Sequence, residues 1–183
     1  LCKIVGDLDN SFIAIQGPPG TGKTYTGAHL VLSLLAEGKR VGITGPSHAA
    51  VDNLLIEVLK TADETGRSHL VDALRRGVAP TSGPLADVKA AGSSDRVAKS
   101  TANVITGTAW LFANAKFAEN PVDVLLIDEA GQVSLADALA ATRSAKNLVL
   151  IGDPQQLPQV AQAAHPEGAD ASVLEHVIGA DRA

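Results

Sequence analysis

Five short apolar runs recur along the chain, and segments with a helical pattern lie between them. The runs cover residues 12–16, 41–45, 103–106, 124–127 and 148–151. Continuous apolar strands that alternate with helices indicate a parallel sheet covered by helices on both faces. We therefore expect an α/β fold in which a parallel β-sheet is flanked by helices.

Four of the intervening segments carry clear helix signals. Residues 24–37 place their apolar side chains on one stripe, and Gly38 follows as a stop. Ser47 can cap the next helix, and Ser134 has capping-box spacing to Asp137 ahead of another. A last short helix is expected over 172–178.

One stretch, residues 61–101, breaks the alternation. It is polar, and several glycines and prolines interrupt two weak helical patterns. Because it is too long for an ordinary connection between a helix and a strand, we expect a small helical insertion there. The 183 residues otherwise suit one domain with its own core. The chain starts at Leu1 and contains no methionine, so we interpret it as a fragment of a longer protein.

The composition is that of an ordinary globular protein, with 45% hydrophobic and 19% charged residues. A net charge of −5 gives no support for nucleic-acid binding, although a local basic strip can lie on an acidic domain. The single cysteine excludes an internal disulfide and fits a reducing cytoplasm. No signal peptide or membrane-spanning run is present, so we expect a cytoplasmic protein without a membrane partner.

A glycine-rich segment lies between the first apolar run and the first helix, and it fits the pattern G-x-x-x-x-G-K-[ST] at every fixed position. Its residues are Gly17, Pro18, Pro19, Gly20, Thr21, Gly22, Lys23 and Thr24. Glycines let successive backbone N–H groups turn inward, and the helix that follows presents its positive end to the same place. The pattern predicts a phosphate-binding loop for ATP.

The side chains of this loop divide the work. Lys23 adds a positive charge for the β- and γ-phosphate oxygens, and the Thr24 hydroxyl is a ligand for Mg²⁺. Tyr25, the next residue of the helix, completes the expected nucleotide contacts.

Two adjacent acids, Asp128 and Glu129, follow the apolar run 124–127. The carboxyl ends of parallel strands line the ligand crevice, so both acids should face the phosphate loop. We expect Asp128 to hold Mg²⁺ through water and Glu129 to orient the water that attacks the γ-phosphate. The segment 147–158 repeats this arrangement, and its Gln156 is placed to hydrogen-bond the γ-phosphate. Alone, an acidic pair or a polar loop after a strand is usually only a solvated turn.

Five ordered segments together resemble superfamily 1 helicases, in particular the 5′-to-3′ branch that includes the nonsense-mediated-decay helicase. They cover residues 16–24, 45–54, 104–108, 128–132 and 152–158, which are similar to motifs I, Ia, Ic, II and III. The segment 7–12 and the glycine at position 131 resemble the corresponding residues of bacterial proteins that fuse a nuclease to such a helicase. The resemblance implies the first RecA-like motor domain of a helicase, with the motif III strand between the motif I and motif II strands.

The resemblance also implies partners that spacing does not show. Contacts to the backbone of single-stranded DNA or RNA are expected from Pro46, Ser47, Asn53, Thr106 and Thr108. Short hydroxyl and amide side chains suit such contacts, because they reach phosphate oxygens without reading bases. A second RecA-like domain of the same chain would complete the ATPase site, and a fused nuclease domain is a further expected partner.

This chain departs from the family pattern in two places. The glutamine-bearing segment that recognises adenine is not evident in residues 1–11, and Gly131 replaces an alanine that is common in motif II. Trp110 and Phe112 follow motif Ic, where core packing is favoured over base stacking. Two alternatives stay open, namely another P-loop phosphotransferase or a nucleotide-sensing module without turnover.

Overall fold

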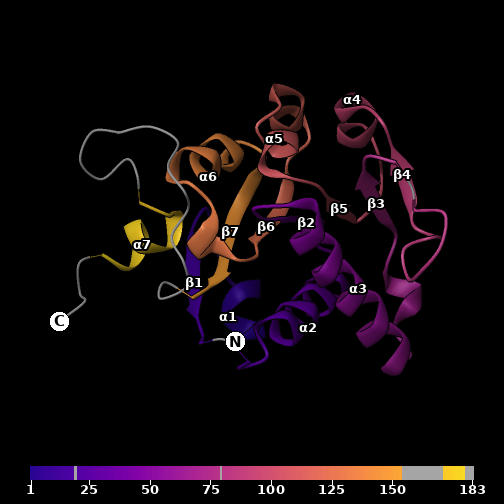
Figure 1. The fold of residues 1–183 in the computed structure, drawn as a ribbon, viewed down its shortest axis with the longest axis horizontal. Helices are drawn as coiled ribbons and strands as arrows, with labels where there is room; N and C mark the ends of the chain where they lie inside the picture. Colours follow the sequence, from indigo (N-terminus) through magenta and orange to yellow (C-terminus); the bar gives the residue numbers. More distant parts are fainter. Residues whose placement is uncertain (19, 79, 154–170, 180–183) are drawn as a thin grey trace.

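The computed structural model describes residues 1–18, 20–78, 80–153 and 171–179. In this part of the chain the strands form one seven-stranded sheet in the order β1-β7-β6-β2-β5-β3-β4, and every pair is parallel. Their bounds are β1 Phe12–Gln16, β2 Val41–Thr44, β3 Ala73–Arg76, β4 Lys89–Ala91, β5 Val104–Thr106, β6 Val122–Ile127 and β7 Ala145–Gly152. The expected parallel α/β fold is confirmed (Figure 1).

Helices cover both faces of this sheet (Figure 1). The α-helices are α1 Cys2–Gly6, α2 Lys23–Ala36, α3 His48–Glu64, α4 Ser94–Ala98, α5 Ala109–Phe112, α6 Leu135–Thr142 and α7 Val173–Ile178. Short 3₁₀ turns lie at η1 Ser68–Leu70, η2 Ala115–Glu119 and η3 Ala130–Gln132. The helices in the described part of the chain are all too short or too polar to cross a membrane.

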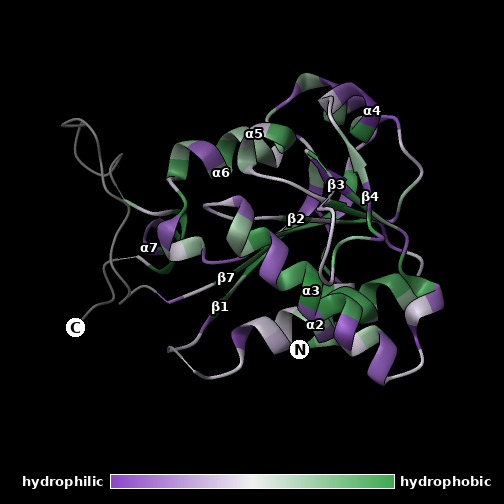
Figure 2. Cartoon of the chain, turned by 45° about the vertical axis from the view of Figure 1, so that its right-hand side comes forward, coloured by the Kyte–Doolittle hydropathy of each residue, from purple (hydrophilic) through white to green (hydrophobic). Residues whose placement is uncertain are grey.

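The strands serve two hydrophobic cores because successive side chains point to opposite faces. In β6, Val124 and Leu126 belong to the core under α2 and α3, whereas Leu125 and Ile127 belong to the core under α5 and α6. Figure 2 shows the central strands as hydrophobic and β3 as partly hydrophilic, with the helices hydrophobic mainly toward the sheet. Burial on both faces is therefore why these strands read as unbroken apolar runs.

The expected helix caps are present. Ser47 accepts a hydrogen bond from the N–H of Ala50 at 3.2 Å, and Ser134 accepts one from Asp137 at 3.0 Å. Ser172 and Glu175 form a full capping box at the start of α7. β7 lies between β1 and β6, so the expected position of the motif III strand is confirmed.

The expectation of a helical insertion over 61–101 is wrong. α3 continues to Glu64, and the segment then adds β3 and β4 to the edge of the main sheet. Its helical content in the described residues is limited to η1 and the five-residue α4. β3 pairs with β5 over only three residues, from Ala73 opposite Val104 to Arg75 opposite Thr106. Strands this short and polar give no apolar run for a sequence pattern to detect.

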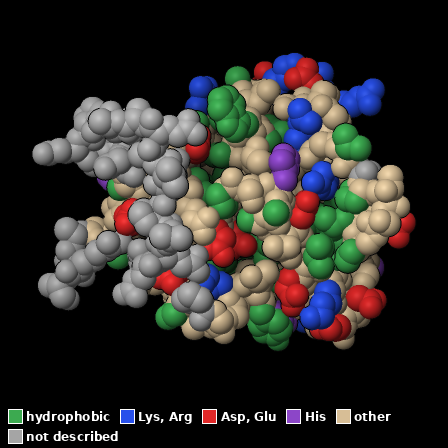
Figure 3. Space-filling model, in the orientation of Figure 1, with side chains coloured by type: hydrophobic (Ala, Val, Ile, Leu, Met, Phe, Trp, Pro, Cys, Tyr) green, Lys and Arg blue, Asp and Glu red, His purple; other side chains and the backbone are tan. Residues whose placement is uncertain are grey.

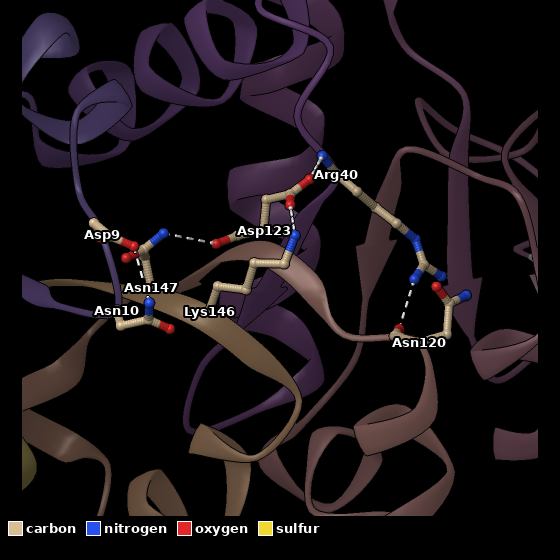
Figure 4. A network of polar contacts seen from close by, with 7 residues as sticks. All are labelled: Asp9, Asn10, Arg40, Asn120, Asp123, Lys146 and Asn147. Carbon is tan, nitrogen blue, oxygen red and sulfur yellow. Dashed lines mark hydrogen bonds and ion pairs between the residues drawn. The ribbon is translucent and has the colours of Figure 1, made fainter.

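A polar network closes the edge of the sheet at which the strands begin (Figure 4). Asp123 at β6 accepts hydrogen bonds from the backbone N–H of Arg40 at 2.8 Å and from Lys146 Nζ at 2.7 Å. Burial opposes ionisation of Asp123, but these two donors outweigh it, so the pKa of this carboxyl is lowered. Arg40 also donates to the carbonyl of Asn120 at 2.8 Å. This network joins the starts of β2, β6 and β7 and leaves the opposite edge for a site.

Candidate nucleotide site and strand-binding surface

The carboxyl ends of the parallel strands all open onto one edge of the sheet. Following the strand order, β1 leads into the phosphate loop, Asp153 follows the end of β7, and Asp128 follows the end of β6. β2 and β5 then lead into the segments at Pro46 and Thr108. The residues expected to bind nucleotide therefore occupy one half of this edge. Those expected to contact single-stranded nucleic acid occupy the other half.

The phosphate loop wraps tightly around its own lysine. Gly20 and Gly22 have φ values of +79° and +80°, which L side chains rarely adopt. A Cβ on Gly17 would lie 2.7 Å from Thr21 Oγ1 and 3.3 Å from the Lys23 side chain. Lys23 Nζ donates to the carbonyls of Gly17 at 2.9 Å and Pro18 at 3.2 Å. The glycines are thus required by backbone shape and by close contact.

The start of α2 supports an anion site. Gly22 is its N-cap, and no described side chain caps the helix there. Its first-turn N–H groups and Lys23 therefore present positive charge at the loop. Tyr25 is 57% exposed, and its ring lies 4.3 Å from that of His29. Pro19 and Gln156 lie outside the described residues.

Asp128 is the buried acid of the site, with 5% of its surface exposed. Burial raises the pKa of its carboxyl to about 6, with a smaller contribution from the charge of Glu129, while the N–H of Glu129 and the charge of Lys23 act in the opposite direction. The Glu129 N–H donates to Asp128 Oδ1 at 3.0 Å. A buried carboxylate held at this energetic cost is one that a divalent cation would stabilise. With the Thr24 hydroxyl, it is a donor set that fits Mg²⁺.

Glu129 has a left-handed backbone, with φ 50° and ψ 43°. A glutamate pays a conformational cost in this region, and such strain gathers at functional sites. The chain turns at Glu129 into η3 directly after Asp128, and Glu129 is half-buried whereas Asp128 is buried. The two adjacent acids therefore differ in burial and in backbone conformation, as two different roles would require.

Motif II packs backbone against backbone on the end of β7. A Cβ on Gly131 would lie 2.5 Å from the carbonyl oxygen of Asp153, and one on Gly152 would lie 2.9 Å from the N–H nitrogen of Gly131. On the other side of β7, the N–H of Gly17 donates to the Gly152 carbonyl at 3.1 Å. The glycine that replaces the family's common alanine is thus a requirement of this packing.

The half of the edge beyond β6 carries the residues expected to contact single-stranded nucleic acid. Pro46, Ser47 and Asn53 are exposed, and Thr108 is half-buried at the N-cap of α5. Ser47 also caps α3 through Ala50. Pro46 and Thr108 line one hollow at the ends of β2 and β5, with Ser47 next to Pro46, whereas Asn53 lies further along α3.

Two sequence expectations for this half need correction. Thr106 is fully buried, and its hydroxyl has no hydrogen-bond partner among the described residues. The structure therefore contradicts the expected strand contact of Thr106, because a buried hydroxyl reaches no phosphate. Phe112 is in the core as favoured, but Trp110 is 82% exposed. Core packing was the wrong expectation for Trp110.

Residues 5–175 match the family model described as the AAA domain. The chain belongs to the AAA domain family. This AAA domain is 33% identical over 153 residues to "DNA replication ATP-dependent helicase/nuclease DNA2" of Saccharomyces cerevisiae, covering 80% of this chain and 10% of that protein. It is 34% identical over 157 residues to "DNA replication ATP-dependent helicase/nuclease JHS1" of Arabidopsis thaliana, covering 82% of this chain and 11% of that protein.

The fold of this AAA domain is also found in a solved structure, that of arterivirus nonstructural protein 10 (helicase) with DNA. The TM-score is 0.51 at 20% identity, over 85% of this chain and 32% of that chain. This likeness shows the fold alone, and the similarity to helicase/nucleases confirms the resemblance to superfamily 1 helicases. The AAA domain spans about a tenth of the length of the yeast and plant relatives.

We expect the Asp128→Asn variant of this AAA domain to be more stable than the wild-type chain above pH 6. The pKa of Asp128 is raised on folding, so the folded wild type binds an extra proton between about pH 4 and pH 6, and its stability falls as the pH rises through that window. Asparagine keeps the acceptor for Glu129 and has no charge to bury. The gain at pH 7.5 should reach about 2–3 kcal/mol. Urea unfolding at pH 5 and pH 7.5 measures it, and a variant less stable at both pH values would contradict it.

The Gly131→Ala variant should lose about 1–3 kcal/mol of stability, because its Cβ meets backbone and not a movable side chain. Gly92→Ala is the matched control, since a Cβ there meets nothing within 4 Å and its φ is not in the left-handed region. Thermal unfolding of both variants tests the packing of motif II on β7. Equal melting temperatures for the two variants would show that the contact is easily relieved.

Proposed function

We propose that this chain is the ATP-binding motor domain of an ATP-dependent helicase that moves along single-stranded DNA or RNA. One observation carries the proposal: a phosphate loop and two adjacent acids face each other across β7, and exposed polar residues continue along the same edge of the sheet. The relatives named helicase/nuclease support it. We further propose that a second RecA-like domain, and a nuclease domain like that of the relatives, belong to the complete protein.

In this proposal each acid and the lysine has one task. Lys23 leaves the Gly17 and Pro18 carbonyls and binds the β- and γ-phosphates, while Thr24 and Asp128 hold Mg²⁺. The cation, when bound, screens the charge of the phosphates. Glu129 orients the attacking water and accepts its proton. Gln156 is proposed as the group that hydrogen-bonds the γ-phosphate.

Three of the described arginines are held away from this site. Arg75 is held by Asp52 in a paired contact at 2.7 and 2.8 Å, and Arg76 lies beside it at the end of β3. Four strands separate β3 from β1, which is about 24 Å at normal strand spacing. Arg40 belongs to the network at the opposite edge. The positive charge that hydrolysis needs on the far side of the γ-phosphate is therefore proposed to come from the second motor domain.

Mg²⁺-ATP should bind at the phosphate loop, and Lys23→Ala should weaken binding by about tenfold or more, because a full charge facing two phosphates is lost. Isothermal titration calorimetry with and without Mg²⁺ measures this. Lys60→Ala is the control for loss of one lysine, since Lys60 is exposed on α3 and pairs only weakly with Glu57 at 3.8 Å. Equal affinities of the wild type and Lys23→Ala would refute the assignment.

The isolated chain should hydrolyse ATP at least about 10³-fold more slowly than a longer chain that includes the second domain, because an arginine at the γ-phosphate is worth about 10³ to 10⁵ in rate. A phosphate-release assay on both chains, with and without an oligonucleotide, measures this. Rapid, strand-stimulated turnover by the 183 residues alone would show that an arginine within them reaches the nucleotide.

A further inference from the structure

Trp110 is the only tryptophan of the sequence, and 82% of it is exposed. Its neighbours in α5 behave differently, because Ala109, Leu111 and Phe112 are all buried. The helix therefore turns its apolar face to the core and holds the indole ring outside. A single exposed apolar side chain is ordinary on a protein surface, so the surroundings of the ring decide whether it is a contact residue.

Two hollows in the surface meet at this ring. One, of about 180 Å³, is lined by His48, Arg76 and Ser94 as well as by Thr108 and Trp110. The other, of about 290 Å³, is lined by the same two residues, by Gly45, Pro46 and Gln132, and by the acidic Asp137. The indole ring thus stands between two hollows, as a base-stacking ring would stand between successive nucleotides.

The lining of the first hollow, which holds Arg76 and His48 and no acid among the described residues, favours a nucleic acid over a protein. Arg76 makes a single hydrogen bond among the described residues, from Nε to Ser94 Oγ at 3.5 Å, so its guanidinium has further donors for a phosphate. In Figure 3, Lys, Arg and His side chains lie among hydrophobic and some acidic ones over α4, α5 and β3 in the upper part of the displayed face. The apolar groove between Phe12, Leu139 and Val177, by contrast, has no cationic Lys or Arg in its lining.

We propose that Trp110 stacks against a base of the bound single strand, with Arg76 and His48 contacting the adjoining phosphates. The inference rests on the proposed function, since it concerns the same strand, and it adds a base contact to a surface expected to touch only the backbone. Stacking on an aromatic ring tolerates any base, because every base has a π-face. The bound single-stranded nucleic acid then runs from the end of β2, past Thr108, to the end of β3.

The single tryptophan makes the test direct. Titration with a single-stranded oligodeoxythymidylate at low salt should quench the intrinsic fluorescence, and an oligonucleotide of equal length made of abasic residues should quench it much less. In anisotropy assays with a labelled oligodeoxythymidylate, Trp110→Ala should lose about tenfold in affinity, whereas Trp110→Tyr should keep most of it. Leu139→Ala removes another exposed apolar side chain, 58% exposed on α6, and should change nothing.

The outcomes separate this inference from the proposed function. Strand binding with equal affinity in the wild type and Trp110→Ala, without quenching, overturns the stacking role and leaves the strand-binding function in place. No anisotropy change with the wild-type chain overturns both. A loss in Trp110→Ala that Trp110→Tyr does not restore also overturns stacking. Circular dichroism of each variant checks that the fold is intact, which is expected because the ring lies outside the core.

Discussion

The strand β7, paired on one side with β1 and on the other with β6, sets the width of the proposed nucleotide site. Two strand spacings separate the phosphate loop from Asp128, which is about 9.6 Å. Neighbouring strands at half that distance would leave no room for a phosphate and a hydrated cation between lysine and carboxylate. The charge of Lys23 nevertheless still reaches Asp128, where it opposes the rise in pKa caused by burial. The spacing therefore keeps Lys23 and Asp128 near enough for their charges to interact but too far apart to form an ion pair.

Backbone contacts hold this spacing more firmly than side chains do. Gly17 donates to the carbonyl of Gly152, Gly131 lies against Asp153, and the N–H of Asp128 donates to the Thr44 carbonyl at 2.9 Å. Side-chain bulk at the glycines would push these segments apart. The protein accepts destabilising features at the same place, namely the buried carboxylate of Asp128 and the left-handed backbone of its neighbour. Local stability is given up where the site gains a preset arrangement of charge.

Sequence patterns predicted those parts of the fold in which one local signal dominates. Strands buried on both faces read as apolar runs, and the phosphate loop has a fixed spacing because its glycines meet backbone constraints. The strand β4 has no such signal, since it is three residues long and lies at an edge. The exposure of Trp110 and the burial of Thr106 depend on where α5 begins and on what packs over β5. Both depend on tertiary packing. The sequence around Trp110 would predict an outward-facing ring only if the first residue of α5 were already known.

The continuous hydrogen-bonded ladder from β1 to β5 also fixes the distance between the two halves of the edge. Four strand spacings, about 19 Å, lie between the phosphate loop and the segment that carries Thr108, and hydrogen bonds fix each of them. A hydrogen-bonded sheet cannot shorten or stretch by the length of a nucleotide without breaking its pairs. In the proposed motor, steps would therefore come from movement of the whole domain against another body, with these strand spacings unchanged through the cycle.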